Sequence, residues 1–398
     1  METSGQRPPV PAPGLLLLLA IALVGFFAFL QVYSVQAVLP LLMHELRATE
    51  VQVGLTVGAT VMGVALVSPF MGMLSDAFGR KRFIIGSMLF LALPTLMLGQ
   101  VTDVGQMMLW RFFQGVAIPG ITVVLIAYIG EDYEGRLMTR LMSLYVAGTV
   151  LGGFMGRFLL GHLSEWLGWR HAFGLMAAFS LAGALFVGWQ LPSSRRFVAR
   201  PNPRAALATL AGHLRNRHVL TACLLGACVL FSLVGCFTYI NLHLAGAPWH
   251  LHSGSLANLF TVYLVGMVVT PLSSWLIGRV GSARTVMLAV GLSMLGVLAA
   301  RSASLSVIVL GLTAMCSGVF ITQAATISYI ALNVREGRSL ASGLYYMAYY
   351  SGGTVGAWAC GLAYAHSAWP AVVGALLAVQ VLALAVAGWG MGGWRACK

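Results

Sequence analysis

Two arginines, Arg111 and Arg157, lie inside long apolar runs that contain few other charged residues. An arginine in hydrocarbon costs about 2.5–3.5 kcal/mol on insertion scales, so it normally faces a cavity or a polar partner. All ten acidic residues lie in predicted loops or at predicted helix ends. Buried cations without a buried acid favour a neutral or anionic ligand, because an organic cation would be repelled at low dielectric. Alternatively, each arginine extends its charged end to the membrane surface, or Arg157 pairs two helices.

The other polar side chains in the apolar runs are amides, tyrosines and a histidine. Such groups can hold an amphipathic organic molecule by stacking and hydrogen bonding, or they can anchor helix ends at the membrane interface. The candidates for contact with a substrate or a proton are Tyr33, Gln36, Gln114, Tyr239, Asn241, His243, Gln323, Tyr346 and Tyr349. A coupled proton would otherwise have to use a helix-end acid, namely Glu45, Asp76, Glu131 or Asp132.

Several kinds of chemistry are absent from the sequence. It has no Gly-Lys-Ser/Thr phosphate-binding loop, no zinc-ligand spacing and no nucleophile elbow. The six cysteines include no Cys-x-x-Cys pair and mostly fall in apolar runs, where they act as packing residues. We therefore predict that the protein is not an enzyme and uses no metal or other cofactor.

The elements that must position these residues follow from composition. The chain of 398 residues is 59% hydrophobic and only 8% charged, whereas soluble domains carry roughly 25% charged residues. Its apolar runs are long enough to cross a bilayer, and such segments must be helices because lipid offers no partners for open backbone groups. The first run is too long for a signal-peptide core. Twelve spans are predicted at 14–41, 52–75, 83–102, 104–130, 138–163, 170–191, 219–246, 253–277, 284–300, 304–332, 338–364 and 367–390.

The basic residues predict how these spans are oriented. With both termini on one side, 18 of the 23 Lys and Arg residues lie on that side, three lie on the other side, and two lie within spans. Positive charge is retained in the cytoplasm, so we predict a multi-pass membrane protein with cytoplasmic termini. The net charge of +13 then reflects topology and contact with anionic lipid, and we predict no binding of nucleic acid.

The two halves of the chain resemble each other. Seven identities recur at a constant offset of 200 residues, including Tyr145 with Tyr345 and Gly152 with Gly352. A weaker echo relates Gly79 to Gly281. Residues 192–218 form the only long polar stretch. We therefore predict an N-terminal six-helix bundle at 1–191, a cytoplasmic linker at 192–218 and a C-terminal six-helix bundle at 219–398, related as parallel repeats.

A charged, glycine-punctuated segment at 72–84 joins the second and third spans. Its spacing, Gly72-x-Leu74-Ser75-Asp76-x-x-Gly79-Arg80-Lys81, resembles the loop between helices 2 and 3 of major facilitator superfamily transporters. The glycines permit a tight reversal of the chain. The resemblance implies that a cytoplasmic gate, which opens and closes as the transporter changes conformation, is formed by Gly72, Asp76, Gly79, Arg80 and Lys81. Alternatively, the segment only orients the protein through its basic residues.

Two further motifs resemble the same superfamily. Arg111 and Gln114, followed by Gly115, resemble the helix-4 signature that the family links to proton transfer. A glycine stripe that would allow close helix approach runs through the fifth span, at Gly148, Gly152, Gly153 and Gly156. Drug antiporters of the family usually carry Gly-Pro where this chain has Gly156-Arg157. The pattern here, with Tyr145 before it, is more similar to the YnfM-type exporters of bacterial inner membranes.

The resemblance implies an all-α membrane protein with the major facilitator fold, in which two pseudo-symmetric six-helix bundles of a monomer move by alternating access. We predict a secondary transporter driven by the proton-motive force, which exports a small neutral or anionic organic molecule such as a metabolite, sugar, siderophore or drug. One alternative is uptake of a small organic anion with protons, with Arg157 as the counter-ion. A second alternative is a membrane sensor or scaffold that has this fold and transports nothing.

Overall fold

The computed structural model describes residues 14–194, 212–334 and 338–392. Within these ranges all regular secondary structure is helical, which confirms the predicted fold class. The first half contains α1 (Leu15–Val32), η1 (Ser34–Val38), α2 (Leu39–Glu45), α3 (Glu50–Phe78), α4 (Arg80–Leu98), α5 (Val104–Asp132), α6 (Gly135–Leu167) and α7 (Trp169–Gln190). The second half contains α9 (Arg217–Ala245), α10 (Ser253–Leu259), η2 (Phe260–Leu264), α11 (Val265–Val280), α12 (Ser282–Ala299), α13 (Leu305–Asn333) and α14 (Arg338–Gly390).

In the described residues, eleven helical segments are long and apolar enough to cross a membrane. The last of them, α14, has non-helical backbone angles at Ser367 and Ala368, where it turns between the two final predicted spans. A straight helix of its 53 residues would be about 80 Å long, far more than a bilayer's thickness. The eleven segments therefore hold the twelve predicted spans.

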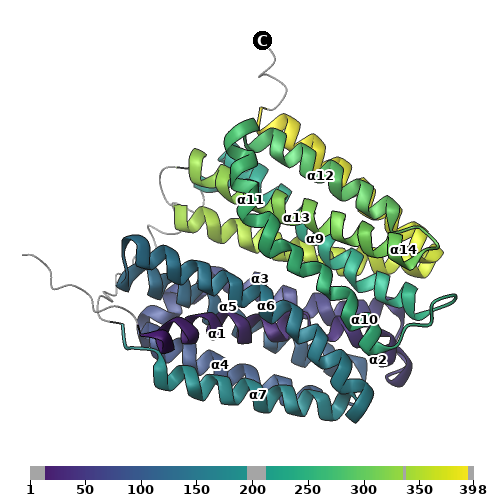
Figure 1. The fold of residues 1–398 in the computed structure, drawn as a ribbon. Coiled ribbons are helices and arrows are strands. Elements are labelled where there is room, and N and C mark those ends of the chain that lie inside the picture. The colour runs from purple at the N-terminus through teal and green to yellow at the C-terminus, as the bar shows by residue number, and fades with distance from the viewer. Residues whose placement is uncertain (1–13, 195–211, 335–337, 393–398) are drawn as a thin grey trace, which may run out of the picture.

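The helices form two bundles, α1–α7 below and α9–α14 above in Figure 1. Ser194 and Gly212 are the described residues of the predicted linker on either side of 195–211. The end of the molecule that carries them is called here the linker end, and the opposite end is called the far end. Most of the predicted linker, 195–211, lies outside the described residues.

The helix joints at the linker end show the predicted echo between the halves. Gly79 joins α3 to α4 with φ of +83°, and Gly281 joins α11 to α12 with φ of +82°. Residues with a Cβ rarely adopt this conformation, which explains why glycine stands at both joints. The Gly79–Gly281 echo in the sequence thus corresponds to the same backbone turn in both halves.

The glycine stripes also make equivalent contacts in the two bundles. A Cβ at Gly152 of α6 would lie 2.1 Å from the carbonyl oxygen of Phe26 in α1. A Cβ at Gly352 of α14 would lie 2.2 Å from the carbonyl oxygen of Ala227 in α9. Side chains cannot fit at such distances, so glycine allows the two helix backbones of each pair to touch.

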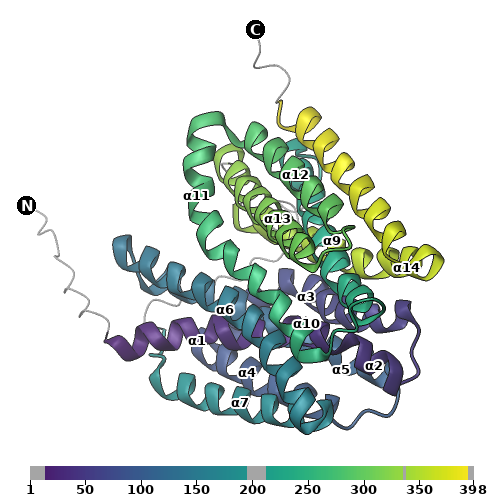
Figure 2. The ribbon, with the colours of Figure 1, turned by 45° about the vertical axis from the view of Figure 1, so that its right-hand side comes forward.

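The two bundles touch each other in the half of the molecule near the far end. The hydroxyl of Thr354 in α14 donates to the carbonyl of Gly58 in α3, and the backbone N–H of Gly254 in α10 donates to the Glu165 carboxylate of α6 at 2.7 Å. Figure 2 shows α10 reaching the N-terminal bundle beside α2. Along α3, the row that begins with Gly54 and Gly58 continues as exposed apolar side chains: Met62, Leu66 and Phe70 are 43%, 55% and 54% exposed. The bundles therefore separate toward the linker end.

Gly54 offers a test of the contact that closes the two bundles at the far end. A Cβ there would lie 2.0 Å from the Tyr239 hydroxyl and 3.3 Å from the Ala357 carbonyl, and both neighbours belong to the opposite bundle. Overpacking costs about 1–3 kcal/mol, and here the cost falls only on the state closed at the far end. We expect Gly54→Val to shift the equilibrium about tenfold toward far-end opening.

The shift is measured as the distance between spin labels at positions 102 and 303, in a chain whose six native cysteines are replaced. Gly86→Val is the matched control, because Gly86 also lies in a helix but has no atom within 4 Å of a Cβ. An unchanged distance distribution in Gly54→Val would contradict the assigned contact.

Candidate functional site

Two membrane-spanning segments are interrupted by 3-10 helix. The first span breaks at η1, between α1 and α2, and the eighth span breaks at η2, between α10 and α11. Neither break was predicted from the sequence, where each segment was expected to be one continuous helix. A 3-10 stretch inside a longer helix often marks a functional position, and discontinuous helices are typical of substrate sites in secondary transporters.

Both breaks bring aromatic side chains to Arg157 of α6. The guanidinium carbon lies 4.7 Å from the ring centre of Tyr33, which ends α1. It lies 4.7 Å from the ring centre of Phe260 and 4.3 Å from that of Tyr263, both in η2. These four residues form what is called here the arginine cage. The cage combines residues of both bundles, so it depends on how the bundles are placed relative to each other.

The charge of Arg157 is buried without an acidic partner among the described residues. The side chain is 1% exposed. Nε donates to the Gln36 side-chain oxygen at 2.8 Å and Nη1 donates to the Gly153 carbonyl, while buried Nη2 has no hydrogen-bond partner in the described structure. Each cation–π contact contributes about 0.5–2 kcal/mol, whereas the buried charge costs several kcal/mol. The cage therefore keeps a cation short of one strong acceptor.

Gln36 connects the cage across the bundle interface. Its side-chain oxygen accepts from Arg157, and its Nε2 donates to the Thr238 hydroxyl of α9 at 3.2 Å. The amide is fully buried. A change in the position of Arg157 would therefore alter the Gln36–Thr238 hydrogen bond, which joins the two bundles.

The tyrosines of α14 pack against one another. The Tyr346 and Tyr350 rings stack at 6.4 Å, and both side chains are partly exposed. The Tyr349 ring centre lies 5.9 Å from that of Tyr345. Of the predicted residues, Tyr33 and Gln36 therefore contact Arg157, whereas Tyr346 and Tyr349 belong to this row of tyrosines.

Arg111 of α5 has a different environment. It is 0% exposed and donates to the carbonyls of Gln31 and Val32 at the end of α1, to the carbonyl of Thr56 in α3, and to the Gln114 side chain at 2.6 Å. Gln114 in turn donates to Thr95 of α4 at 2.7 Å. Arg111 and Gln114 thus bind four helices of one bundle together. Both arginine side chains are buried inside the protein, so the alternative that either extends its charged end to the membrane surface is wrong.

The other four predicted residues belong to α9 and α13 of the C-terminal bundle. The Tyr239 hydroxyl donates to the Ala357 carbonyl at 2.6 Å at the bundle contact. Asn241 is buried in α9 with its side-chain oxygen unpaired in the described structure. His243 stacks on Trp369 at the far end, with ring centres 5.7 Å apart. Gln323 is a partly exposed residue of α13.

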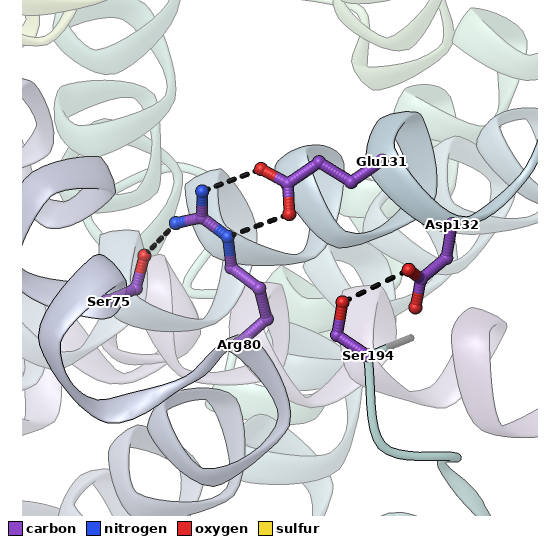
Figure 3. A network of polar contacts seen from close by, with 5 residues as sticks. All are labelled: Ser75, Arg80, Glu131, Asp132 and Ser194. Carbon is purple, nitrogen blue, oxygen red and sulfur yellow. Dashed lines mark hydrogen bonds and ion pairs between the residues drawn. The ribbon is translucent and has the colours of Figure 1, made fainter. Parts of the chain in front are cut away.

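The predicted gate lies at the linker end, where α3 turns into α4. Arg80, 7% exposed, donates from Nη2 to Glu131 Oε1 at 2.6 Å and from Nε to Oε2 at 3.1 Å, and it also contacts the Ser75 hydroxyl (Figure 3). This bidentate pair fixes the α3–α4 turn to the end of α5. Lys81 lies in the first turn of α4, and the side-chain positions 72 and 76 lie outside the described residues.

A second contact beside the gate involves the start of the predicted linker. The Ser194 hydroxyl donates to Asp132 Oδ1 at 3.0 Å (Figure 3). Asp132 and Glu131 are the last two residues of α5. The end of α5 therefore contacts both the α3–α4 turn and the first residues after the N-terminal bundle.

Comparisons with known proteins agree with this architecture. A family model described as Major Facilitator Superfamily matches residues 21–357. The chain is 29% identical to the MFS-type transporter YybF of Bacillus subtilis, over 92% of this chain and 91% of YybF. It is 28% identical to the inner membrane transport protein YnfM of Escherichia coli, over 92% of this chain and 88% of YnfM.

A solved structure extends the comparison to the fold. The crystal structure of a bacterial homolog of the human lysosomal transporter Spinster, in an inward-facing and unoccupied conformation, has a TM-score of 0.76 and 16% identity, over 95% of this chain and 96% of that chain. At this identity the likeness concerns the fold alone.

Proposed function

The chain belongs to the major facilitator superfamily and is a multi-pass membrane protein that acts as a secondary transporter, and we propose that it exports a small neutral or anionic organic molecule. In this proposal the substrate binds at the arginine cage, between the two bundles, and export is driven by the proton-motive force. The molecule would be a metabolite, sugar, siderophore or drug of that charge class.

The observation that carries the proposal is the unpaired Nη2 of buried Arg157. A carboxylate, phosphate or hydroxyl oxygen of a substrate would accept from it and offset the cost of the buried charge. Tyr33 and Tyr263 would stack on an apolar or planar part of the same molecule. An organic cation would meet an uncompensated positive charge, so the cage excludes that class of substrate.

For an anionic substrate, the membrane potential supports export as the direction of transport. A bacterial membrane is negative inside, and each elementary charge that crosses it changes the free energy by about 2.3 kcal/mol per 100 mV. This potential drives an anion outward, and exchange for an inward proton adds to the driving force. The glycine stripe of α6, which resembles that of the family's exporters, also supports export.

The proposed topology places both termini and the linker end in the cytoplasm of a bacterial inner membrane, because most Lys and Arg residues lie there. We keep 1–191, 192–218 and 219–398 as the bundle and linker boundaries. With this topology, the bundles are separated on the cytoplasmic side, and a substrate would reach the arginine cage from the cytoplasm. Asp76, Gly79 and Arg80 then act in the cytoplasmic gate, with Glu131 as the partner of Arg80.

The experiment compares extracellular metabolites from cells that overexpress the intact protein, cells that lack it and cells with Arg157→Gln, each with and without a protonophore. We expect a neutral or anionic compound that accumulates outside only with the intact protein and an intact proton gradient. Export insensitive to the protonophore would remove proton coupling from the proposal.

Energised vesicles distinguish export from the alternative of uptake. If the compound enters right-side-out vesicles with protons, and Arg157→Gln stops that entry, the protein is an anion symporter. Transport of organic cations at a comparable rate would overturn the assignment of the cage as the substrate site.

A further inference from the structure

A second cavity lies at the linker end of the C-terminal bundle, separate from the arginine cage. Its volume is about 880 Å³, within the usual range for sites that bind small molecules. The first turn of α9 and the ends of α13 and α14 form its walls, with Met287 of α12. None of the residues in the arginine cage lines it.

One side of this cavity is polar and ordered by hydrogen bonds. The Tyr329 hydroxyl donates to the Gly390 carbonyl at 3.1 Å, and the ring Nδ1 of His218 lies 2.5 Å from the same hydroxyl. Asn333 donates to the Tyr329 carbonyl at 2.9 Å. Arg217 lines the same side, is exposed, and has no acidic partner among the described residues.

The opposite side of the cavity is apolar and continues onto the outer surface of α14. Val381, Leu384, Ala385 and Trp389 line it. Val381 is 53% exposed and Trp389 is 88% exposed. In a membrane helix, exposed apolar side chains face lipid, and an exposed tryptophan near a helix end is typical of the membrane interface.

The charged residues described near the cavity are all positive. The described residues of the C-terminal bundle, 212–334 and 338–392, include no Asp or Glu. Its linker end carries Arg215, Arg217, Arg279 and Arg284. Within this part of the chain the positive charge has no internal counter-charge, so an anionic ligand from outside would neutralise it.

We propose that this cavity binds one anionic phospholipid from the leaflet at the linker end. Arg217 pairs with the lipid phosphate, and the His218–Tyr329 pair and Asn333 give the head group polar neighbours. An acyl chain lies along Val381, Leu384 and Ala385. Basic pockets between membrane helices recognise anionic head groups by this combination of charge and apolar wall, and a soluble anion would leave the apolar wall unused.

The test uses native mass spectrometry of the purified full chain with added phosphatidylglycerol or phosphatidylcholine. We expect one phosphatidylglycerol per chain, and about fivefold weaker retention in Arg217→Ala, the effect of one basic residue at a membrane surface. Arg284→Ala is the matched control, because Arg284 is exposed at the same end but does not line the cavity. Equal retention by the two variants, or equal retention of phosphatidylcholine by the intact chain, would overturn the proposal.

Two more measurements locate the lipid and identify its source. Brominated phosphatidylglycerol should quench a part of the tryptophan fluorescence that disappears in Trp389→Phe, and unchanged quenching in that variant would place the lipid elsewhere. Glycerol phosphate at millimolar concentration should leave the bound lipid in place. Displacement by glycerol phosphate would identify the cavity as a site for soluble phosphates and would overturn the lipid assignment.

Discussion

Replacing Arg157 with Gln should strongly reduce transport while leaving the protein folded. The variant loses the cation and the Nη2 donor that the proposed substrate would meet. Hydrogen bonds to charged groups contribute about 1.5–3 kcal/mol, so the transport rate at low substrate concentration should fall about 10- to 100-fold. The measurement is initial flux in vesicles that contain equal amounts of folded protein.

Arg157→Lys should not restore transport. A lysine ammonium is a point charge without the planar fork that stacks between Tyr33 and Tyr263 while donating to Gln36. Arg301→Gln provides the control for loss of a positive charge, because Arg301 is exposed between α12 and α13. Normal flux in Arg157→Gln would remove the arginine cage from the mechanism.

Arg157→Gln should not lower the thermal stability of the protein. Burying a charge without an acidic partner costs several kcal/mol, and the glutamine that replaces Arg157 has no charge to desolvate. The lost hydrogen bonds and cation–π contacts are of similar size to this cost, so the two largely cancel. We therefore expect a melting temperature close to that of the unchanged protein. Loss of function with unchanged or higher stability would indicate that the charge is kept for binding.

The sequence predicted most of the fold because the relevant signals are local. Apolar run lengths gave the twelve spans, and glycines at offsets of about 200 residues gave the equivalence of the halves. Gly79 and Gly281 are identifiable because only glycine readily takes the positive φ of their turns. In each case the physical reason lies within the few residues that carry the signal.

The break at η2 was not predictable in this way, whereas Pro40, the second residue of α2 after η1, is a local signal for the first break. Residues 259–265 contain no glycine or proline, and their side chains are as apolar as those of the flanking helices. What holds η2 in place is its packing near α6, including the contacts of Phe260 and Tyr263 with Arg157. Such contacts join residues about 100 positions apart, and no local pattern reports them.

The different environments of the two buried arginines could likewise not be predicted from local sequence. Both were predicted from sequence as candidates for substrate or proton contact. The structure surrounds Arg111 with backbone carbonyls from α1 and α3 and leaves Arg157 short of one acceptor. Those carbonyls lie 55 to 80 residues away in the sequence, and every residue type has a carbonyl, so composition cannot reveal them.

The second large effect should come from Arg111, and it should concern folding. Arg111→Ala leaves the carbonyls of Gln31, Val32 and Thr56 buried and without this donor. Each hydrogen bond to a charged group contributes about 1.5–3 kcal/mol, so the loss of the three is worth about 4 kcal/mol or more, a large part of the usual net stability of a protein. A bundle of this size should lose about 10 °C in melting temperature, together with much of its folded yield.

The two arginines should therefore separate when flux per folded molecule is plotted against melting temperature. Arg111→Ala lowers the melting temperature because α1 loses its attachment to α3 and α5, and Arg111→Lys should fall between, since one ammonium cannot reach all three carbonyls with the geometry of a guanidinium. The surviving folded Arg111→Lys molecules should transport at a rate within a few-fold of the unchanged protein, because their arginine cage is intact. If instead Arg111→Lys keeps full stability and loses transport, Arg111 acts in the transport cycle itself and its carbonyl contacts are not the reason for its burial.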